Sequence, residues 1–384
     1  MLPNAIVIKE AIKRNDISLE SLAHSIFRDK ANDFIAFIHS KDSTKQSLSH
    51  SVSLKLGYKN LLQLAEKLDI PFGYLFLQEM PKENTKIAEL RRKNPKSKIS
   101  QVLKESIKNS EYKQLWYRDY LIEIGQEAQY NKKFDNEKEV IEKIKLMLYF
   151  NTLPKNPYKA LNQMIERLQD KNFLIFIATR INRSNSKKLD IEDFRGYCLY
   201  DKYAPVIFLN NQDSYKGKIF TLLHELAHIL YGKNGIILLD NEHHQELEKT
   251  CNFIAGEILI PKYLLLEQWD KKLNVSQNVD SLKDIFKLAS DEAIATKAIN
   301  LKLISQEQYE EYIEECKAKP KKKPYSPNND KKVFKSIIKE NSKNFVEAIV
   351  AQTYNNKLDF KTAMDYLGIK EIKYFRGIQE EIGL

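Results

Sequence analysis

The sequence has few of the residues that mark several large protein classes. Its 384 residues include only three cysteines, 11 glycines and 11 prolines. The cysteines, Cys198, Cys251 and Cys316, lie far apart and form no CxxC pair, which argues against a disulfide scaffold and against a thiolate zinc site. The low glycine and proline contents exclude collagen-like and low-complexity chains. The length predicts two or three folded domains.

Long hydrophobic runs are also missing. The longest, such as residues 173–178, fall far short of the roughly 20 apolar residues that a membrane helix requires. The N-terminal stretch has an early acidic residue and no cleavage site after an apolar core, so it does not resemble a secretory signal. We therefore expect a cytoplasmic protein without a membrane partner.

The composition is that of a folded protein, with 42% hydrophobic and 30% charged residues. Lysine and arginine number 62 and aspartate and glutamate 52, which leaves a net charge of +10. That excess is compatible with contact with nucleic acid, although the charge alone does not locate it.

Helical periodicity dominates the N-terminal region, residues 1–82. One helix is expected to have Ser18 as its N-cap, and a second should begin at Tyr58 and end before Pro71. Between these helices, the Ser-rich residues 41–53 have no periodicity and predict a loop.

The remaining chain divides into five regions by its hydrophobic pattern. Short runs rich in Ile, Phe, Tyr and Val predict a small sheet, followed by two helices, within the central region. Its neighbours are predicted to be helical, apart from a Lys/Pro-rich segment that is typical of an exposed linker. The regions are 83–169 (helical), 170–265 (sheet, at 173–178, 196–200 and 206–210, and helices), 266–316 (helical), 317–330 (linker) and 331–384 (helical).

The most informative segment is an HExxH motif. In a helix, His224 and His228 lie one turn apart on the same face, so two imidazole nitrogens can reach one ion. Glu225 is rotated by about 100° from His224, which suits a general base beside the open position of a metal. The surrounding positions are apolar nearly all round, as in a buried helix. The motif predicts a Zn²⁺ site. The alternatives are an inactive zinc site that merely joins two helices and a pair of core histidines that bind no metal.

Zinc in a catalytic site needs one further protein ligand. We favour Glu248, because it begins a second apolar helix that ends before Pro261, and a rigid helix presents a carboxylate well. Asn252, one turn further, could orient a ligand imidazole. The rivals to Glu248 are His243 and His244, in a polar stretch; the full set of candidates is Asp240, Glu242, His243, His244, Glu246 and Glu248.

Two further features of the site are predicted. An extended substrate could add to an exposed sheet edge, for which the strand at residues 206–209 is the candidate. An oxyanion stabiliser is also required, and Tyr231 or Asn210 could supply it.

Several segments together resemble the ImmA/IrrE family of zinc metallopeptidases. They are DFRG at 193–196, APVIFLNN at 204–211, FTLLHELAH at 220–228, EKTCN at 248–252 and LIP at 259–261. Residues 59–65 and 70–76 are similar to an XRE-type helix-turn-helix module, although its usual middle signature is replaced by the Ser-rich stretch. Residues 345–350 and 363–368 resemble the C-terminal part of longer family members.

The resemblance implies an α+β fold that is mostly helical, with a zincin-like core formed by a small sheet and the HExxH helix. It implies a gluzincin-like zinc endopeptidase of regulatory type that cleaves a helix-turn-helix repressor. His224, His228 and Glu248 would be ligands and Glu225 the base. The alternative is a DNA-binding transcriptional regulator in which the peptidase-like domain is a sensor or interaction module.

Overall fold

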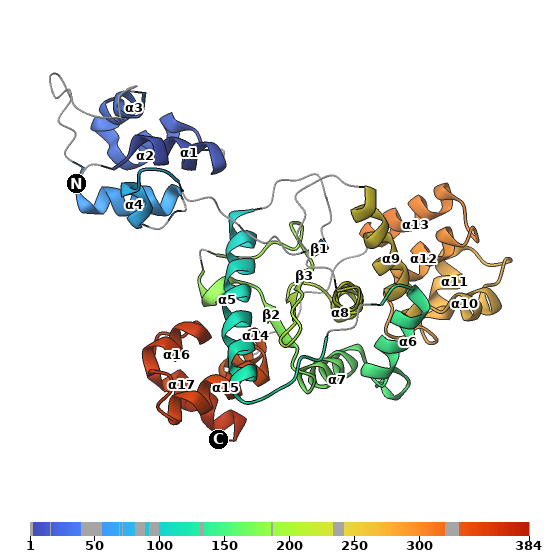
Figure 1. Ribbon diagram of the computed structural model, residues 1–384. Coiled ribbons are helices and arrows are strands. Elements are labelled where there is room, and N and C mark those ends of the chain that lie inside the picture. The colour runs from blue at the N-terminus through green and yellow to red at the C-terminus, as the bar shows by residue number, and fades with distance from the viewer. Residues whose placement is uncertain are drawn as a thin grey trace. The chain divides into compact units, whose positions relative to one another are not determined.

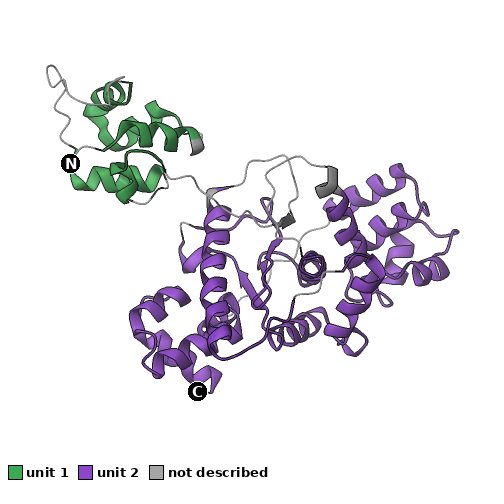
Figure 2. Ribbon diagram, viewed as in Figure 1, with its two compact units in different colours: residues 1–85 green, residues 86–384 purple. Residues whose placement is uncertain are grey.

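The computed structural model describes eleven segments of the chain, and the statements below refer to them. They are residues 3–15, 17–39, 56–68, 70, 72–80, 89–91, 100–130, 134–185, 187–232, 242–318 and 330–383. The chain divides into two compact units, Met1–Thr85 and Lys86–Leu384 (Figure 2). Both this division and the boundary expected after residue 82 fall outside the described residues, as do the Ser-rich stretch at 41–53 and most of the linker at 317–330.

Unit 1 is helical. Ser18 accepts a hydrogen bond from the backbone nitrogen of Ser21, which confirms it as an N-cap. The helix expected from Tyr58 ends at Leu68, also as predicted. The helices bury one shared apolar core; they are α1 (Ala5–Asn15), α2 (Leu19–Phe27), α3 (Ala31–His39) and α4 (Tyr58–Leu68), with short 3-10 segments η1 (Arg28–Lys30) and η2 (Phe72–Phe76).

Unit 2 contains a four-stranded sheet with the order β1-β3-β4-β2. β2 and β4 are parallel, and the other two pairs are antiparallel. Three of the strands were predicted from their β-branched and aromatic runs. β1 was missed and lies in a region predicted to be helical, because a strand of three residues has no recognisable periodicity. The strands are β1 (Glu89–Arg91), β2 (Leu174–Ala178), β3 (Gly196–Leu199) and β4 (Val206–Asn210).

The strand order corrects one expectation about substrate binding. β4 pairs with β3 on one side and with β2 on the other, so residues 206–209 have no free edge to which a peptide could add. A strand's position in a sheet depends on tertiary pairing, which the local pattern of residues 206–209 does not contain. The edges of the sheet are β1 and β2.

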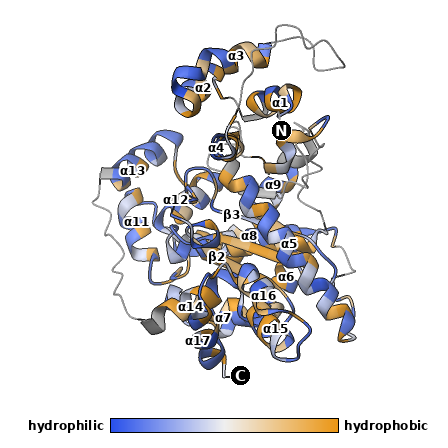
Figure 3. Ribbon diagram, turned by 90° about the vertical axis from the view of Figure 1, so that its left-hand side faces the viewer, coloured by the Kyte–Doolittle hydropathy of each residue, from blue (hydrophilic) through white to orange (hydrophobic). Residues whose placement is uncertain are grey.

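Side chains alternate along each strand between two helical layers. Ile175, Ile177 and Cys198 belong to one hydrophobic core, and Phe176 and Tyr197 belong to the other. The first core lies beneath α6, α7, α8, α9 and the helices that follow, and the second lies beneath α5 and the C-terminal helices (Figure 1). In Figure 3 the region around β2 is strongly hydrophobic, whereas the outer helix α13 is largely hydrophilic.

The helices of unit 2 confirm the predicted α+β class. They are α5 (Gln101–Glu123), α6 (Glu137–Met147), α7 (Pro157–Gln169), α8 (Tyr215–Leu230), α9 (Glu242–Leu259), α10 (Lys262–Gln268), α11 (Val275–Leu282), α12 (Asp291–Asn300), α13 (Gln306–Ala318), α14 (Asp330–Asn341), α15 (Lys343–Tyr354), α16 (Phe360–Leu367) and α17 (Ile372–Ile382), with 3-10 segments η3 (Phe150–Thr152) and η4 (Ile181–Arg183). No described helix has the length and apolar character needed to cross a membrane.

One helix boundary was predicted wrongly. Glu248 was expected to begin a helix, but α9 already begins at Glu242. Its first residues are polar and therefore lack the apolar spacing by which a helix is recognised in a sequence. Glu248 consequently lies inside the helix.

Candidate metal centre

The HExxH motif lies on α8, a buried helix that packs on the sheet. Every residue from Thr221 to Leu230 is buried, and His224, Glu225 and His228 have no exposed surface. The helix packs against β3 and β4 on one side and against α6, α7 and α9 elsewhere. Burial on all sides explains the apolar pattern around the three polar residues.

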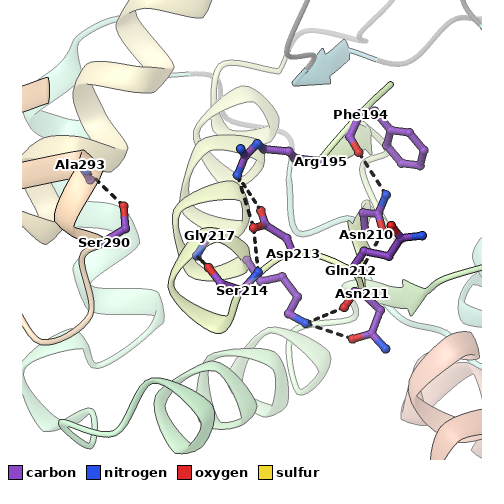
Figure 4. A network of polar contacts seen from close by, with 11 residues as sticks. Phe194, Arg195, Asn210, Asn211, Gln212, Asp213, Ser214, Gly217, Ser290 and Ala293 are labelled. Carbon is purple, nitrogen blue, oxygen red and sulfur yellow. Dashed lines mark hydrogen bonds and ion pairs between the residues drawn. The ribbon is translucent and has the colours of Figure 1, made fainter. Parts of the chain in front are cut away.

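A polar network fixes the beginning of α8 (Figure 4). Ser214 is the N-cap and accepts a hydrogen bond from the backbone nitrogen of Gly217 at 3.0 Å. The buried carboxylate of Asp213 accepts from the backbone nitrogen of Ser214 at 2.7 Å and forms an ion pair with Arg195 at 3.2 Å. Because Arg195 directly precedes β3, the network ties the helix start to the sheet. Sequence reasoning missed Asp213, although an Asp-Ser pair before an apolar helix is a recognisable capping signal.

A buried lysine holds the same end of the helix. Lys218 donates to the backbone oxygen of Asn211 at 3.2 Å and to its Oδ1 at 3.0 Å. Burial lowers the pKa of Lys218 to about 8, and the charge of Lys339 adds to this effect while Asp213 opposes it. The registry of α8 against the sheet is therefore fixed by charged and polar groups ahead of the motif.

Three predicted ligands converge at one point between α8 and α9. The Nε2 atoms of His224 and His228 are 3.0 Å apart, and they lie 3.3 Å and 3.2 Å from the two carboxylate oxygens of Glu248. Each residue offers a ligand atom within 4.8 Å of the others. The structure thus packs α9 against α8 so that Glu248 lies beside both histidines, as its choice as the third ligand required.

The separations between these donor atoms suit a zinc ion. Metal–ligand bonds of about 2.0–2.1 Å in a tetrahedron place the ligand atoms about 3.3 Å from one another. The two Nε2 atoms are 3.0 Å apart, and each lies 3.2 or 3.3 Å from a different oxygen of the Glu248 carboxylate. Two imidazoles and a carboxylate are also the donor types that zinc accepts. The residues present therefore fit a zinc ion in geometry and in chemistry.

The environment keeps Glu248 ionised. Burial opposes its ionisation, but hydrogen bonds and charge from His224 and His228 outweigh that effect and hold the pKa of Glu248 well below its usual range. Its side chain retains 26% exposure, whereas the two histidines have none. An anionic carboxylate at the solvent side of two buried imidazoles is an arrangement that attracts a cation.

Asn252 is exposed, one turn beyond Glu248, and its orienting role stays a prediction. The side chains of His243 and His244 lie outside the described residues, and Glu246 is exposed.

The two candidates for oxyanion stabilisation differ in their surroundings. Asn210 is buried. Its amide nitrogen donates to the Phe194 carbonyl and its amide oxygen accepts from the Gln212 backbone nitrogen, so the side chain stabilises the end of β4. Tyr231 caps the C-terminus of α8, half-buried, and burial raises the pKa of its hydroxyl to about 12. A hydroxyl that stays protonated can donate a hydrogen bond, and an oxyanion-stabilising role stays a prediction for either residue.

Comparison with known proteins bears on this part of the chain. Residues 177–296 match the peptidase family model described as the IrrE N-terminal-like domain. The matched segment contains the end of β2, β3, β4, α8 and α9, and therefore all the residues of the candidate centre. No curated protein matches the chain significantly. The family match supports a metallopeptidase-type function for unit 2. The matched residues are only a part of that unit.

Proposed function

We propose that this protein is a zinc-dependent endopeptidase of regulatory type. The observation that carries the proposal is the convergence of His224 Nε2, His228 Nε2 and the Glu248 carboxylate in a segment that matches a peptidase family. When bound, zinc would polarise a substrate carbonyl and acidify water at the site.

Glu225 is the proposed general base. It lies on α8 next to His224 and is fully buried, so its carboxylate acts in surroundings from which bulk water is excluded. It would take a proton from the attacking water and deliver it to the amide nitrogen that leaves. His224, His228 and Glu248 would hold the metal, and Tyr231 could donate to the developing oxyanion.

The proposed substrate is a protein of the same compartment, most simply a helix-turn-helix repressor, and we propose a cytoplasmic location. Cleavage of such a target requires a narrow specificity, which the HExxH helix itself does not provide. The regulatory role rests on the family likeness.

The decisive experiment compares two glutamate variants. Purified wild type and Glu225→Gln are assayed for bound zinc and for cleavage of candidate repressors. We expect both proteins to hold about one zinc and only wild type to cleave. Glu257→Gln is the matched control, because Glu257 lies on α9 and pairs with Lys297 away from the ligands. Equal cleavage by wild type and Glu225→Gln would reject the proposal.

A second candidate function is DNA binding by unit 1. It is favoured by the separate helical core of this unit, in which α2 and α3 follow one another with only the short segment η1 between them. A steep salt dependence together with a preference of roughly a thousandfold for one duplex would support a transcriptional regulator. Binding that ignores sequence would count against it.

A further inference from the structure

A polar pocket lies on the face of the sheet opposite the metal centre. Its floor is formed by Phe176 and Phe208, which belong to the core beneath α5 and the C-terminal helices. The metal-binding helix α8 packs on the other core. The pocket has a volume of about 20 Å³, which is room for one or two groups of the size of an oxygen atom.

Lys113 of α5 reaches into this pocket and is 5% exposed. Its ammonium donates to Asn341 Oδ1 at 2.6 Å and lies 5.4 Å from the centre of the Phe176 ring. An ammonium has three hydrogens to donate, and no ion pair of Lys113 within 4.0 Å occurs among the described residues. Burial lowers the pKa of Lys113 to about 8, and the charge of Glu340 partly opposes this. A buried cation that faces a neutral amide is stabilised by an anion.

The carboxylate whose charge acts on Lys113 is already paired with other groups. Glu340 accepts two hydrogen bonds from Arg183 at 2.9 and 3.0 Å and a third from Ser336 at 2.7 Å. Arg180 also lines the pocket. Three cationic side chains therefore face one carboxylate, and the pocket retains an excess of positive charge.

Hydroxyl groups line the α5 side of the pocket. Ser106 and Ser110 each form a hydrogen bond with the Tyr197 hydroxyl, at 2.9 and 2.8 Å. Three hydroxyls have three hydrogens, and the two bonds between them use only two. When Tyr197 donates one of these bonds and accepts the other, the hydroxyl of one serine is left to donate to a further acceptor.

The backbone that presents Arg183 adopts an uncommon conformation. Asn182 and Arg183 have φ values of 44° and 59°, in the left-handed region that non-glycine residues rarely adopt. The turn follows the carboxyl end of β2, and Gly368 packs against it. A Cβ at Gly368 would lie only 3.0 Å from the Cα of Asn182, so the turn leaves little room for a larger residue there. Strained turns held by their surroundings are frequent at ligand sites, and ligands often bind beyond the carboxyl ends of parallel strands.

We infer that this pocket binds the oxyanion head group of a small molecule, with Lys113 and Arg183 as its charged donors. Phosphate is the fullest match, because it accepts hydrogen bonds from several directions and arginine forks suit it. The enclosed space admits one or two oxygens, so the remainder of the molecule would stay at the pocket mouth. The inference concerns the opposite face of the sheet and is independent of the proposed peptidase activity.

The test measures binding of inorganic phosphate and of acetate to the full-length protein by calorimetry at constant ionic strength. Because phosphate can also ligate a metal, the titration is repeated with His224→Ala. We expect saturable binding of one anion per chain in both proteins. The inference would be overturned if neither phosphate nor acetate bound saturably to wild type, or if the binding were lost in His224→Ala.

Three variants locate the site. Asn341→Asp provides Lys113 with an internal carboxylate, so binding should fall at least tenfold. Because the Asn341 amide also donates to the Ile337 and Leu367 carbonyls, thermal unfolding of this variant is measured alongside. Lys113→Met and Arg183→Gln should weaken binding similarly. Lys218→Met is the matched control, since Lys218 is also a buried lysine with an asparagine partner, but outside this pocket. Equal affinity in Lys113→Met and wild type would contradict the site.

Discussion

The Nε2 atoms of His224 and His228 lie 3.0 Å apart on successive turns of one buried helix. Two neutral imidazoles at this distance need a shared proton or a cation, because two lone pairs that face each other repel. Glu248, from the next helix, places its carboxylate beside both nitrogens. The arrangement therefore couples metal binding to the packing of α8 on α9.

Zinc should stabilise unit 2 as well as activate it. A ligand that binds only the folded state at about a thousand times its Kd adds about 4 kcal/mol to the free energy of unfolding. We expect removal of the metal with a chelator to lower the Tm of unit 2 by about 6 °C. Hydrogen exchange should become faster in α8 and α9. His228→Ala should be insensitive to the chelator, and an equal response of wild type and this variant would contradict the assignment.

Glu248 should contribute to metal affinity through its charge. Glu248→Gln keeps the shape of the side chain but replaces an anionic ligand by an amide, so zinc affinity should fall by about a hundredfold or more. Glu246→Gln, two residues earlier on an exposed position of α9, is the control and should bind zinc as wild type does. Competition with a zinc indicator measures both. Matching affinities in the two variants would show that another residue completes the site.

The sequence predicted the helix-borne part of the centre because its geometry is local. His224, Glu225 and His228 share one helix, and the 3.6-residue repeat determines which side chains share a face. Glu248 was chosen from six candidates by its apolar surroundings, and the structure places it against both imidazoles. The start of α9 was wrong, because its polar first turns give no periodic signal.

Features that depend on tertiary pairing could not be predicted in this way. The position of β4 inside the sheet follows from its pairing with β2 and β3, which no local pattern encodes. The anion pocket combines Lys113, Arg183 and Asn341 from segments far apart in the chain. Each is unremarkable in its own segment, so no motif marks the pocket.

Gly196 should be required for the close approach of α8 to the sheet. A Cβ at this position would overlap the Thr221 side chain, one turn before His224, and would lie 2.7 Å from the backbone oxygen of Phe208. Because a backbone atom cannot give way cheaply, we expect Gly196→Ala to lower the free energy of unfolding by about 1–3 kcal/mol. Zinc affinity should fall as well, since the clash displaces α8.

Gly256 provides the matched control for this substitution. It lies within α9, and a Cβ there meets nothing within 4 Å, so Gly256→Ala should be neutral or should stabilise by about 0.5–1 kcal/mol. Denaturant unfolding of both variants measures the difference. Similar stabilities for the two alanine variants would refute the packing argument.

The buried ammonium of Lys113 should make stability depend on pH in the alkaline range. Its pKa falls from 10.5 to about 8 on folding, because burial disfavours the charged form more than Glu340 supports it. Between these values the unfolded chain binds more protons than the folded one, so the free energy of unfolding should rise with pH. Relative to Lys113→Met, wild type should gain about 3 kcal/mol between pH 8 and pH 10.5. Urea unfolding without added phosphate measures the difference, and Lys361→Met, at an exposed position of α16, controls for loss of a positive charge. A difference that stays flat over this range would show that Lys113 remains charged in the folded protein.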